Sequence, residues 1–142
     1  MDIQTELSLF TGYAGFTLGL RLAGFNSKNV CYVEQDPYCQ SVIQARIREG
    51  DLNDAPIWDD IKTFDGRPWH GTDIITAGFP CQPFSVAGQR KGTEDERHLW
   101  PEMLRVIGEC QPRWVVGENV RGLVNWSDGL VLEACYSDLE NL

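Results

Sequence analysis

The sequence lacks any apolar run that approaches the roughly 18 residues of a membrane-spanning helix. It also starts without the basic, apolar and small-residue segments of a secretory leader. Both absences favour a protein of the cytoplasm. The 142 residues, 42% of them hydrophobic, are enough for one soluble domain with a core of its own.

Paired cysteines are missing as well. The cysteines number five, which is odd, and no two of them form a Cys-X-X-Cys pair. This pattern argues against a disulfide framework and against a zinc site, and it fits the reducing cytosol. We therefore expect no metal.

Basic residues are scarce. The chain has 12 lysines and arginines against 21 aspartates and glutamates, which gives a net charge of −9. Because proteins contact nucleic-acid phosphates with lysine and arginine, this balance is unfavourable for nucleic-acid binding by the chain alone.

Short apolar runs alternate with stretches of helical spacing along the chain. Strands are expected at about 7–10, 30–33, 57–61, 73–77 and 114–117. Helices are expected at about 16–24, 37–48 and 99–110, and from about 129 onward. The alternation predicts an α/β fold of the Rossmann-like, doubly wound type, with one parallel sheet in the order 3-2-1-4-5 and helices on both faces.

A glycine turn, Phe10-Thr11-Gly12-Tyr13-Ala14-Gly15, joins the first expected strand to the first helix. Glycine there lets the backbone approach a ligand closely, and the helix N-terminus faces that ligand. Taken alone, such a segment is more often a plain tight turn. Glu34, however, ends the second strand about twenty residues later, where a carboxylate can accept hydrogen bonds from both hydroxyls of a ribose. The combination favours a nucleotide-type cofactor site.

The segment Gly78-Phe79-Pro80-Cys81-Gln82-Pro83-Phe84-Ser85 follows the fourth expected strand. Its prolines lack N–H groups and restrict their neighbours, so the chain leaves the strand as a stiffened loop. In open α/β sheets, ligands and chemistry lie at the carboxyl ends of strands. Cys81 is therefore a candidate nucleophile, although the loop alone is equally compatible with a buried structural cysteine.

Glu118-Asn119-Val120 ends the fifth expected strand. Neighbouring parallel strands end at one edge of the sheet, so Glu118 can lie beside Cys81 despite their distance in the sequence. A buried glutamate near an anion has a raised pKa and can stay protonated to donate a hydrogen bond. The alternative is an exposed carboxylate at a strand end.

Two other segments are candidates for function. Asp60, at the end of the third expected strand, can meet the exocyclic amine of a base or can simply stabilise a turn. Residues 87–97 are rich in glycine, charged and polar residues. They predict a long loop of the kind that often serves as a lid.

Together these segments resemble the cytosine-5 DNA methyltransferases. The glycine turn, Glu34, Asp60-Ile61, the Pro-Cys-Gln loop and Glu118-Asn119-Val120 occur in the order of that family and span nearly the whole chain. The last two are the specific ones. Ala14 departs from the usual glycine, and its side chain is small enough to be tolerated. The resemblance implies the class I fold of S-adenosylmethionine-dependent methyltransferases.

The resemblance also implies a mechanism. The Cys81 thiolate attacks carbon 6 of a cytosine flipped out of double-stranded DNA, while protonated Glu118 hydrogen-bonds ring nitrogen 3. Carbon 5 then takes the methyl group of S-adenosylmethionine, a base removes the carbon 5 proton, and the thiolate leaves. Ser85 and Asn119 are implied to bind the DNA substrate, with Ser85 at a phosphate beside the flipped base.

The residues that the resemblance assigns to the cofactor lie at the ends of expected strands or at the start of the next helix. They are Phe10 against the adenine, Gly12 and Gly15 at the amino-acid part, Glu34 at the ribose, Asp60 and Ile61 at the adenine, and Pro80 and Leu99 elsewhere in the pocket.

The family continues with an arginine-bearing strand, a target-recognition region and a closing helix. We therefore expect residues 1–142 to be the truncated, N-terminal part of the catalytic domain. Such a part should be inactive alone, and it should either self-associate or require a complementing C-terminal polypeptide. The missing part would carry most of the basic DNA-reading surface, and the enzyme would be cytoplasmic, or associated with the nucleoid if bacterial.

Two other functions stay open. One is a non-catalytic domain that binds S-adenosylmethionine or a partner protein, as half of a split enzyme would. The other is a different Rossmann-type enzyme, such as a nicotinamide oxidoreductase. The incomplete glycine pattern and the Pro-Cys-Gln loop argue against the second.

Overall fold

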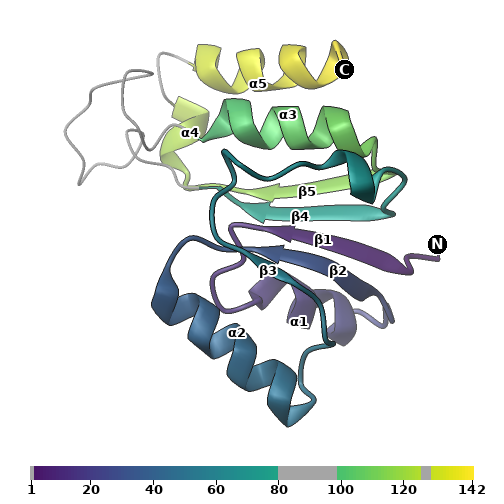
Figure 1. The fold of residues 1–142 in the computed structure, drawn as a ribbon. Helices are drawn as coiled ribbons and strands as arrows, with labels where there is room; N and C mark the ends of the chain where they lie inside the picture. The colour runs from purple at the N-terminus through teal and green to yellow at the C-terminus, as the bar shows by residue number, and fades with distance from the viewer. Residues whose placement is uncertain (1, 80–98, 126–128) are drawn as a thin grey trace.

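The computed structural model describes residues 2–79, 99–125 and 129–142. A single sheet of five strands runs through the described part of the chain (Figure 1), in the order β3-β2-β1-β4-β5. The strands are β1 (Thr5–Leu9), β2 (Lys28–Val33), β3 (Ile57–Trp58), β4 (Ile74–Gly78) and β5 (Trp114–Glu118). All four pairings are parallel, which confirms the strand order expected from the sequence.

Helices cover both faces of this sheet (Figure 1). One face carries α1 (Gly15–Leu22) and α2 (Pro37–Glu49). The other carries α3 (Trp100–Cys110), α4 (Gly122–Asn125) and α5 (Leu130–Glu140). A short 3-10 helix, η1 (Arg67–Trp69), contacts α3. The doubly wound α/β architecture is therefore confirmed, and α4 and η1 are elements that the sequence pattern did not predict.

Asp36 and Pro37 set the start of helix α2. The Asp36 carboxylate accepts hydrogen bonds from the backbone N–H groups of Tyr38 and Cys39, and Pro37 occupies the first helical turn. An acidic N-cap followed by proline is a strong start signal, because proline needs no N–H partner there. Gly50, with a φ of 81°, ends the helix in the left-handed conformation that glycine tolerates best.

The third strand is shorter than the expected range of 57–61. A turn replaces its last residues. The Asp60 carboxylate accepts from the backbone N–H of Lys62 at 2.9 Å, and the Asp60 carbonyl accepts from that of Thr63 at 3.0 Å. Aspartate bonds its own backbone in this way and competes with the strand ladder, so the turn begins one residue after Trp58.

A carboxyl group is buried in the centre of the fold. Glu6 of β1 is fully buried, and its Oε1 accepts from Thr17 Oγ1 of α1 at 3.0 Å and from Thr76 Oγ1 of β4 at 2.8 Å. Asn29 of β2 donates to Thr17 Oγ1 at 3.0 Å. Among the described residues, Glu6 Oε2 and Asn29 Oδ1 lack partners. Burial raises the pKa of Glu6 above its usual value, although hydrogen bonds from Thr76 and Thr17 oppose the rise.

We expect this carboxyl to make stability depend on pH. Because its pKa is raised in the folded state, the folded chain keeps a proton that the unfolded chain has lost. The free energy of unfolding should therefore fall as the pH rises from about 4.5 through the raised value. Glu6→Gln, which is neutral and of equal shape, should remove that part of the slope. Urea unfolding of both proteins between pH 4 and 9 measures the difference.

The control for this experiment is Glu133→Gln, at an exposed position on α5. It should unfold with the same pH dependence as the parent chain. Parallel stability curves for the parent and Glu6→Gln would show that Glu6 is ionised in the folded state.

One sheet face is poorly covered near β5, which is an edge strand within the described chain. Trp114 and Val116 are 45% and 41% exposed there. If further elements normally cover this part of the fold, Val115, Leu130 and Leu132 are expected to be bare. Leu130 is exposed, but that expectation is wrong for Val115 and Leu132, which pack against the core between the sheet and α3 and α5.

Candidate functional site

The candidate site lies at the carboxyl edge of the sheet. The glycine turn follows β1, Glu34 follows β2, Phe79 follows β4 and Asn119 follows β5. The strands are all parallel, so these four segments meet at one edge (Figure 1), as the sequence predicted. Pro80, Cys81 and Ser85 lie outside the described residues.

The glycine turn is held by the end of β2. Thr11 donates its backbone N–H to the Val33 carbonyl at 3.1 Å, and its hydroxyl donates to the Ser8 carbonyl at 3.0 Å. Gly12 has a φ of +55° and donates its N–H to Glu34 Oε2 at 2.6 Å. Glycine is favoured at this position because a side chain is strained at positive φ.

Two other residues of the turn have unusual backbone conformations. Phe10 has a φ of 51° and Ala14 a φ of 61°. A bulky residue in this region is a genuine outlier, and such outliers gather at ligand sites. Ala14 departs from the glycine usual in the resembling family, and the left-handed conformation costs alanine about 1–2 kcal/mol. Its small side chain is nonetheless buried in a core cluster with Tyr32 and Ile43.

Glu34 holds the backbone of two segments and also lines a cavity. Its Oε1 accepts from the Asp36 backbone N–H at 2.7 Å, while Oε2 holds Gly12. A carboxylate can accept about four hydrogen bonds, so acceptor capacity is left for a ligand. Glu34 lines a cavity of about 480 Å³ together with Phe10, Gln35, Asp36, Pro37, Gly78 and Leu99. The structure thus brings together three predicted cofactor residues from three separate segments.

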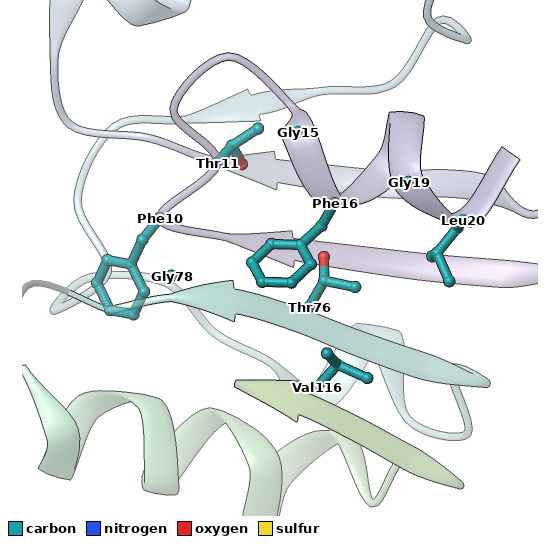
Figure 2. A pocket seen from close by; sticks show the side chains of 9 residues that line it. All are labelled: Phe10, Thr11, Gly15, Phe16, Gly19, Leu20, Thr76, Gly78 and Val116. Atoms are coloured by element: carbon teal, nitrogen blue, oxygen red, sulfur yellow. The ribbon is translucent and has the colours of Figure 1, made fainter. Parts of the chain in front are cut away.

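A second cavity of about 420 Å³ adjoins the first, since Phe10 and Gly78 line both. Figure 2 shows Phe16 and Leu20 of α1 facing Thr76 of β4 and Val116 of β5. The remaining lining residues are Thr11, Gly15 and Gly19. Gly15 is exposed, and a methyl group there would meet nothing within 4 Å. Phe10 therefore lines both a cavity that contains the Glu34 and Asp36 carboxylates and a more apolar one beside Gly15.

Glu118 lies directly across from the start of the Cys81 loop. Gly78 and Glu118 are register partners in β4 and β5, and a methyl group added to Gly78 would lie 3.6 Å from Glu118 Oε2. Cys81 is three residues beyond Gly78. Glu118 is exposed in this structure, so the expectation of a buried glutamate was wrong for the described chain. Burial would require a further covering element or a bound ligand.

Asn119 ties the two strand ends together. Its Nδ2 donates to the Phe79 carbonyl at 3.2 Å, and its Oδ1 accepts from the Val120 backbone N–H at 2.8 Å. The side chain therefore fixes the Phe79 carbonyl, directly after the end of β4, relative to the end of β5.

Asp60 and Ile61 lie farther along the same edge, in the turn after β3. The Ile61 side chain is only 4% exposed and packs in the core, so only its backbone can face a ligand. In the described part of the chain, neither residue lines the two cavities above. Their role at the adenine stays a prediction.

The other cysteines are poor candidates for the nucleophile. Burial raises the pKa of Cys31 to about 11 and that of Cys110 to about 12, and it also raises the pKa of Cys135. Desolvation and the Glu34 carboxylate raise the pKa of Cys39. Because the thiolate is the nucleophilic form, these four thiols are largely unreactive at neutral pH.

Several residues of the site carry no sequence signal of their own. Phe16 and Thr76 belong to ordinary helical and strand patterns, and Gln35 lies in the connection between β2 and α2. Only the fold brings these residues to the cavities. Asp36 is recognisable from the sequence as a helix cap, but its position beside Glu34 depends on the path of the chain after β2.

Comparison with known proteins agrees with this geometry. Residues 5–142 match the family described as C-5 cytosine-specific DNA methylase. The chain belongs to this family. S-adenosylmethionine is the cofactor of such methyltransferases, and the enzyme class expected from the sequence is confirmed at the level of the family.

Similar proteins include type II DNA methyltransferases of bacteria. The chain is 36% identical to M.AquIA of Picosynechococcus over 93% of its own length, and 39% identical to M.NgoMIV of Neisseria gonorrhoeae over 85%. It is 35% identical to M.HhaI of Haemophilus parahaemolyticus over 96%. The matches cover only 54%, 37% and 39% of these relatives, so the chain spans about half of their length or less.

Solved structures confirm the fold. The Dnmt2 methyltransferase of S. pombe superposes with a TM-score of 0.70 over 97% of this chain and 42% of its own, at 24% identity. An S-adenosylmethionine-dependent methyltransferase of Clostridium acetobutylicum gives a TM-score of 0.51 over 86% of this chain and 41% of its own, at 16% identity. At these identities the likeness concerns the fold alone.

Two further features bear on the class of protein. Across residues 2–79, 99–125 and 129–142, no helix combines the length and apolar character needed to cross a bilayer. Over the same ranges, histidine, cysteine, aspartate and glutamate do not gather in a group of three that could hold a metal ion.

Proposed function

We propose that this chain supplies the cofactor-binding and catalytic edge of a DNA (cytosine-5-)-methyltransferase. Family membership over residues 5–142 supports this function, and so does one geometric observation: the register pairing of Gly78 with Glu118. That pairing puts a carboxylate beside the strand end from which Cys81 follows. Double-stranded DNA with a flipped cytosine is the substrate.

The residues present suit S-adenosylmethionine. The Glu34 carboxylate has spare acceptor capacity for a ribose, and the Phe10 ring can stack on an adenine. Gly15 leaves open space for the amino-acid group. When bound, the cofactor supplies an electrophilic methyl group. The chain's own residues orient the cofactor and exclude water from it.

The catalytic work falls to Cys81 and Glu118. Cys81 adds to carbon 6 of the cytosine, and a proton on Glu118 stabilises the negative charge that would otherwise develop on the ring. The Asn119 side chain, bonded to the Phe79 carbonyl, ties the end of β4 to the end of β5 beside Glu118. Ser85 contacts a neighbouring phosphate, and Asp60, Ile61, Pro80 and Leu99 complete the cofactor pocket with Gly12.

Glu34 offers the simplest test of cofactor binding. Glu34→Ala should weaken binding of S-adenosylhomocysteine about 10- to 100-fold, because hydrogen bonds to a charged group are lost. The same change also removes the hydrogen-bond partner of the Gly12 and Asp36 N–H groups. The loss of affinity should therefore exceed the loss caused by removing a carboxylate elsewhere on the surface. Calorimetry on the chain at millimolar ligand measures both affinities.

The matched control is Glu49→Ala, on the exposed end of α2. It should bind S-adenosylhomocysteine as the parent does. Equal affinity for the parent and Glu34→Ala would remove Glu34 from the site. Thermal stabilisation by NAD but not by S-adenosylmethionine or S-adenosylhomocysteine would instead favour a nicotinamide enzyme.

A split-enzyme subunit is the second candidate. The chain spans about half of M.AquIA, and the β4–β5 face carries exposed Trp114 and Val116. On this reading, the chain is inactive alone and gains activity from a separate C-terminal polypeptide.

A further inference from the structure

Arg105 of α3 lies against the turn that follows β3. Its Nη2 donates to the Ile61 carbonyl at 2.7 Å, and its Nη1 donates to the Phe64 carbonyl at 2.9 Å. One guanidinium thus bonds two backbone oxygens of a turn that lies 41 to 44 residues away in the sequence.

The guanidinium is itself fixed in place by two carboxylates. Nε donates to Glu102 Oε2 at 3.0 Å, and Nη1 donates to Glu109 at 2.9 Å. Glu109 Oε2 also accepts from the Gly66 backbone N–H at 2.7 Å, which ties α3 to the residues just after the turn. The Arg105 side chain is only 33% exposed, so these bonds are partly shielded from water.

The turn's own hydrogen bonds include one from the Phe64 backbone N–H to the Ile61 carbonyl at 3.3 Å, which is longer than the bond from Arg105. Strand β3 has only two residues, and among the described strands it pairs with β2 alone. Ile61 and Phe64 are buried side chains that fix the turn against the core, but apolar contacts do not set the direction of a peptide plane. The two hydrogen bonds from Arg105 set the direction of the peptide planes, because each directs a carbonyl toward α3.

We propose that Arg105 is a positioning residue that orients Asp60 and the Ile61 backbone for recognition of an adenine edge. The inference rests on the proposed function, which places an adenine-bearing cofactor at this turn. With the Ile61 and Phe64 carbonyls directed toward α3, the Asp60 carboxylate stays bonded to the Lys62 N–H and in reach of an exocyclic amine.

Lysine would not replace Arg105. The guanidinium uses planar donors to reach two carbonyls and two carboxylates at once, whereas an ammonium has three donors at a single point. The geometry of the Arg105 donors therefore matters more than their charge. We expect Arg105→Lys to lose the positioning of the turn although it keeps the charge.

The test compares Arg105→Lys and Arg105→Met with the parent chain. The matched control is Arg46→Met, which removes an exposed arginine from its ion pairs on α2. The first measurement is hydrogen exchange of the Trp58 indole N–H, which donates to Thr63 Oγ1 across the turn at 3.0 Å. Both Arg105 variants should exchange this proton at least about tenfold faster, and Arg46→Met should not.

The second measurement is the preference for S-adenosylhomocysteine over S-inosylhomocysteine, which has an oxygen in place of the exocyclic amine. The parent should prefer the adenine compound at least about tenfold, because the oxygen would face the Asp60 carboxylate. Both Arg105 variants should lose most of that preference. Arg46→Met should keep it, and Glu34→Ala should weaken both ligands alike.

Each outcome decides a different claim. Failure of the parent to bind S-adenosylhomocysteine would defeat the proposed function and this inference with it. Binding with an intact preference in both Arg105 variants would overturn the inference alone, even if Trp58 exchanged faster, because Arg105 would then stabilise the turn without positioning it. If Arg105→Met does not fold, Arg105→Lys decides.

Discussion

Replacing Cys81 with serine is expected to lower methyl transfer at least about 1,000-fold in the enzyme that contains this chain. A serine hydroxyl is almost entirely protonated at neutral pH, whereas a thiol with an ordinary pKa of about 8.5 already supplies a few per cent of thiolate. A thiolate is also a better leaving group when the methylated base is released. The rate of labelled methyl transfer from S-adenosylmethionine to mixed-sequence DNA measures the loss.

Cys39→Ser is the matched control. Cys39 is the least buried of the other four cysteines, and the nearby Glu34 carboxylate helps to raise its pKa. This variant should keep nearly all activity. Retention of more than a tenth of the activity by Cys81→Ser would place the nucleophile elsewhere.

The second large effect concerns the chain taken alone. The 142 residues should show no methyl transfer, and they should associate with one another. In the described chain β5 is an edge strand with unpaired backbone groups, and Trp114 and Val116 expose apolar surface beside a cavity of about 420 Å³. Edges and patches of this kind promote association. Glu118 is exposed at the end of this edge strand in the described chain.

Addition of the C-terminal part of the enzyme, fused or as a second polypeptide, should restore methyl transfer and suppress light scattering. The Cys81→Ser chain should bind that part equally well and remain inactive, which separates assembly from chemistry. Robust methylation by the purified 142-residue chain would contradict the first half of this prediction. A strictly monomeric chain would contradict the second.

The features that the sequence revealed were those set by local chemistry. The strand order followed from alternating apolar runs and the handedness of crossovers, and α2 followed from Asp36 and Pro37. The convergence of Glu34 with the glycine turn followed from parallel strands alone, and the bond from Gly12 to Glu34 confirms that the two segments meet.

The features that escaped the sequence depend on distant contacts. No pattern in Thr5–Leu9 marks Glu6 as a fully buried acid, because its partners Thr17 and Thr76 come from α1 and β4. No pattern in α3 distinguishes Arg105 from a solvated helix charge. The short β3 reflects competition by the Asp60 side chain.

The exposure of Glu118 has a different origin. Its position at the end of β5 was predicted, and its register opposite Gly78 agrees with that position. Its burial depends on what covers the edge of the sheet, and the carboxylate has no such cover within the described residues. A sequence pattern identifies a strand end more readily than the solvent exposure of its last side chain.

The most direct measurement of the central claim is covalent trapping. DNA that carries 5-fluorocytosine cannot lose its fluorine after methylation, so it should hold the complete enzyme as a stable adduct in the presence of S-adenosylmethionine. Proteolysis and mass spectrometry should place the cross-link on the peptide that contains Cys81, and Cys81→Ser should form no adduct. A stable adduct at Cys31, Cys39, Cys110 or Cys135, or one formed by the serine variant, would contradict the account.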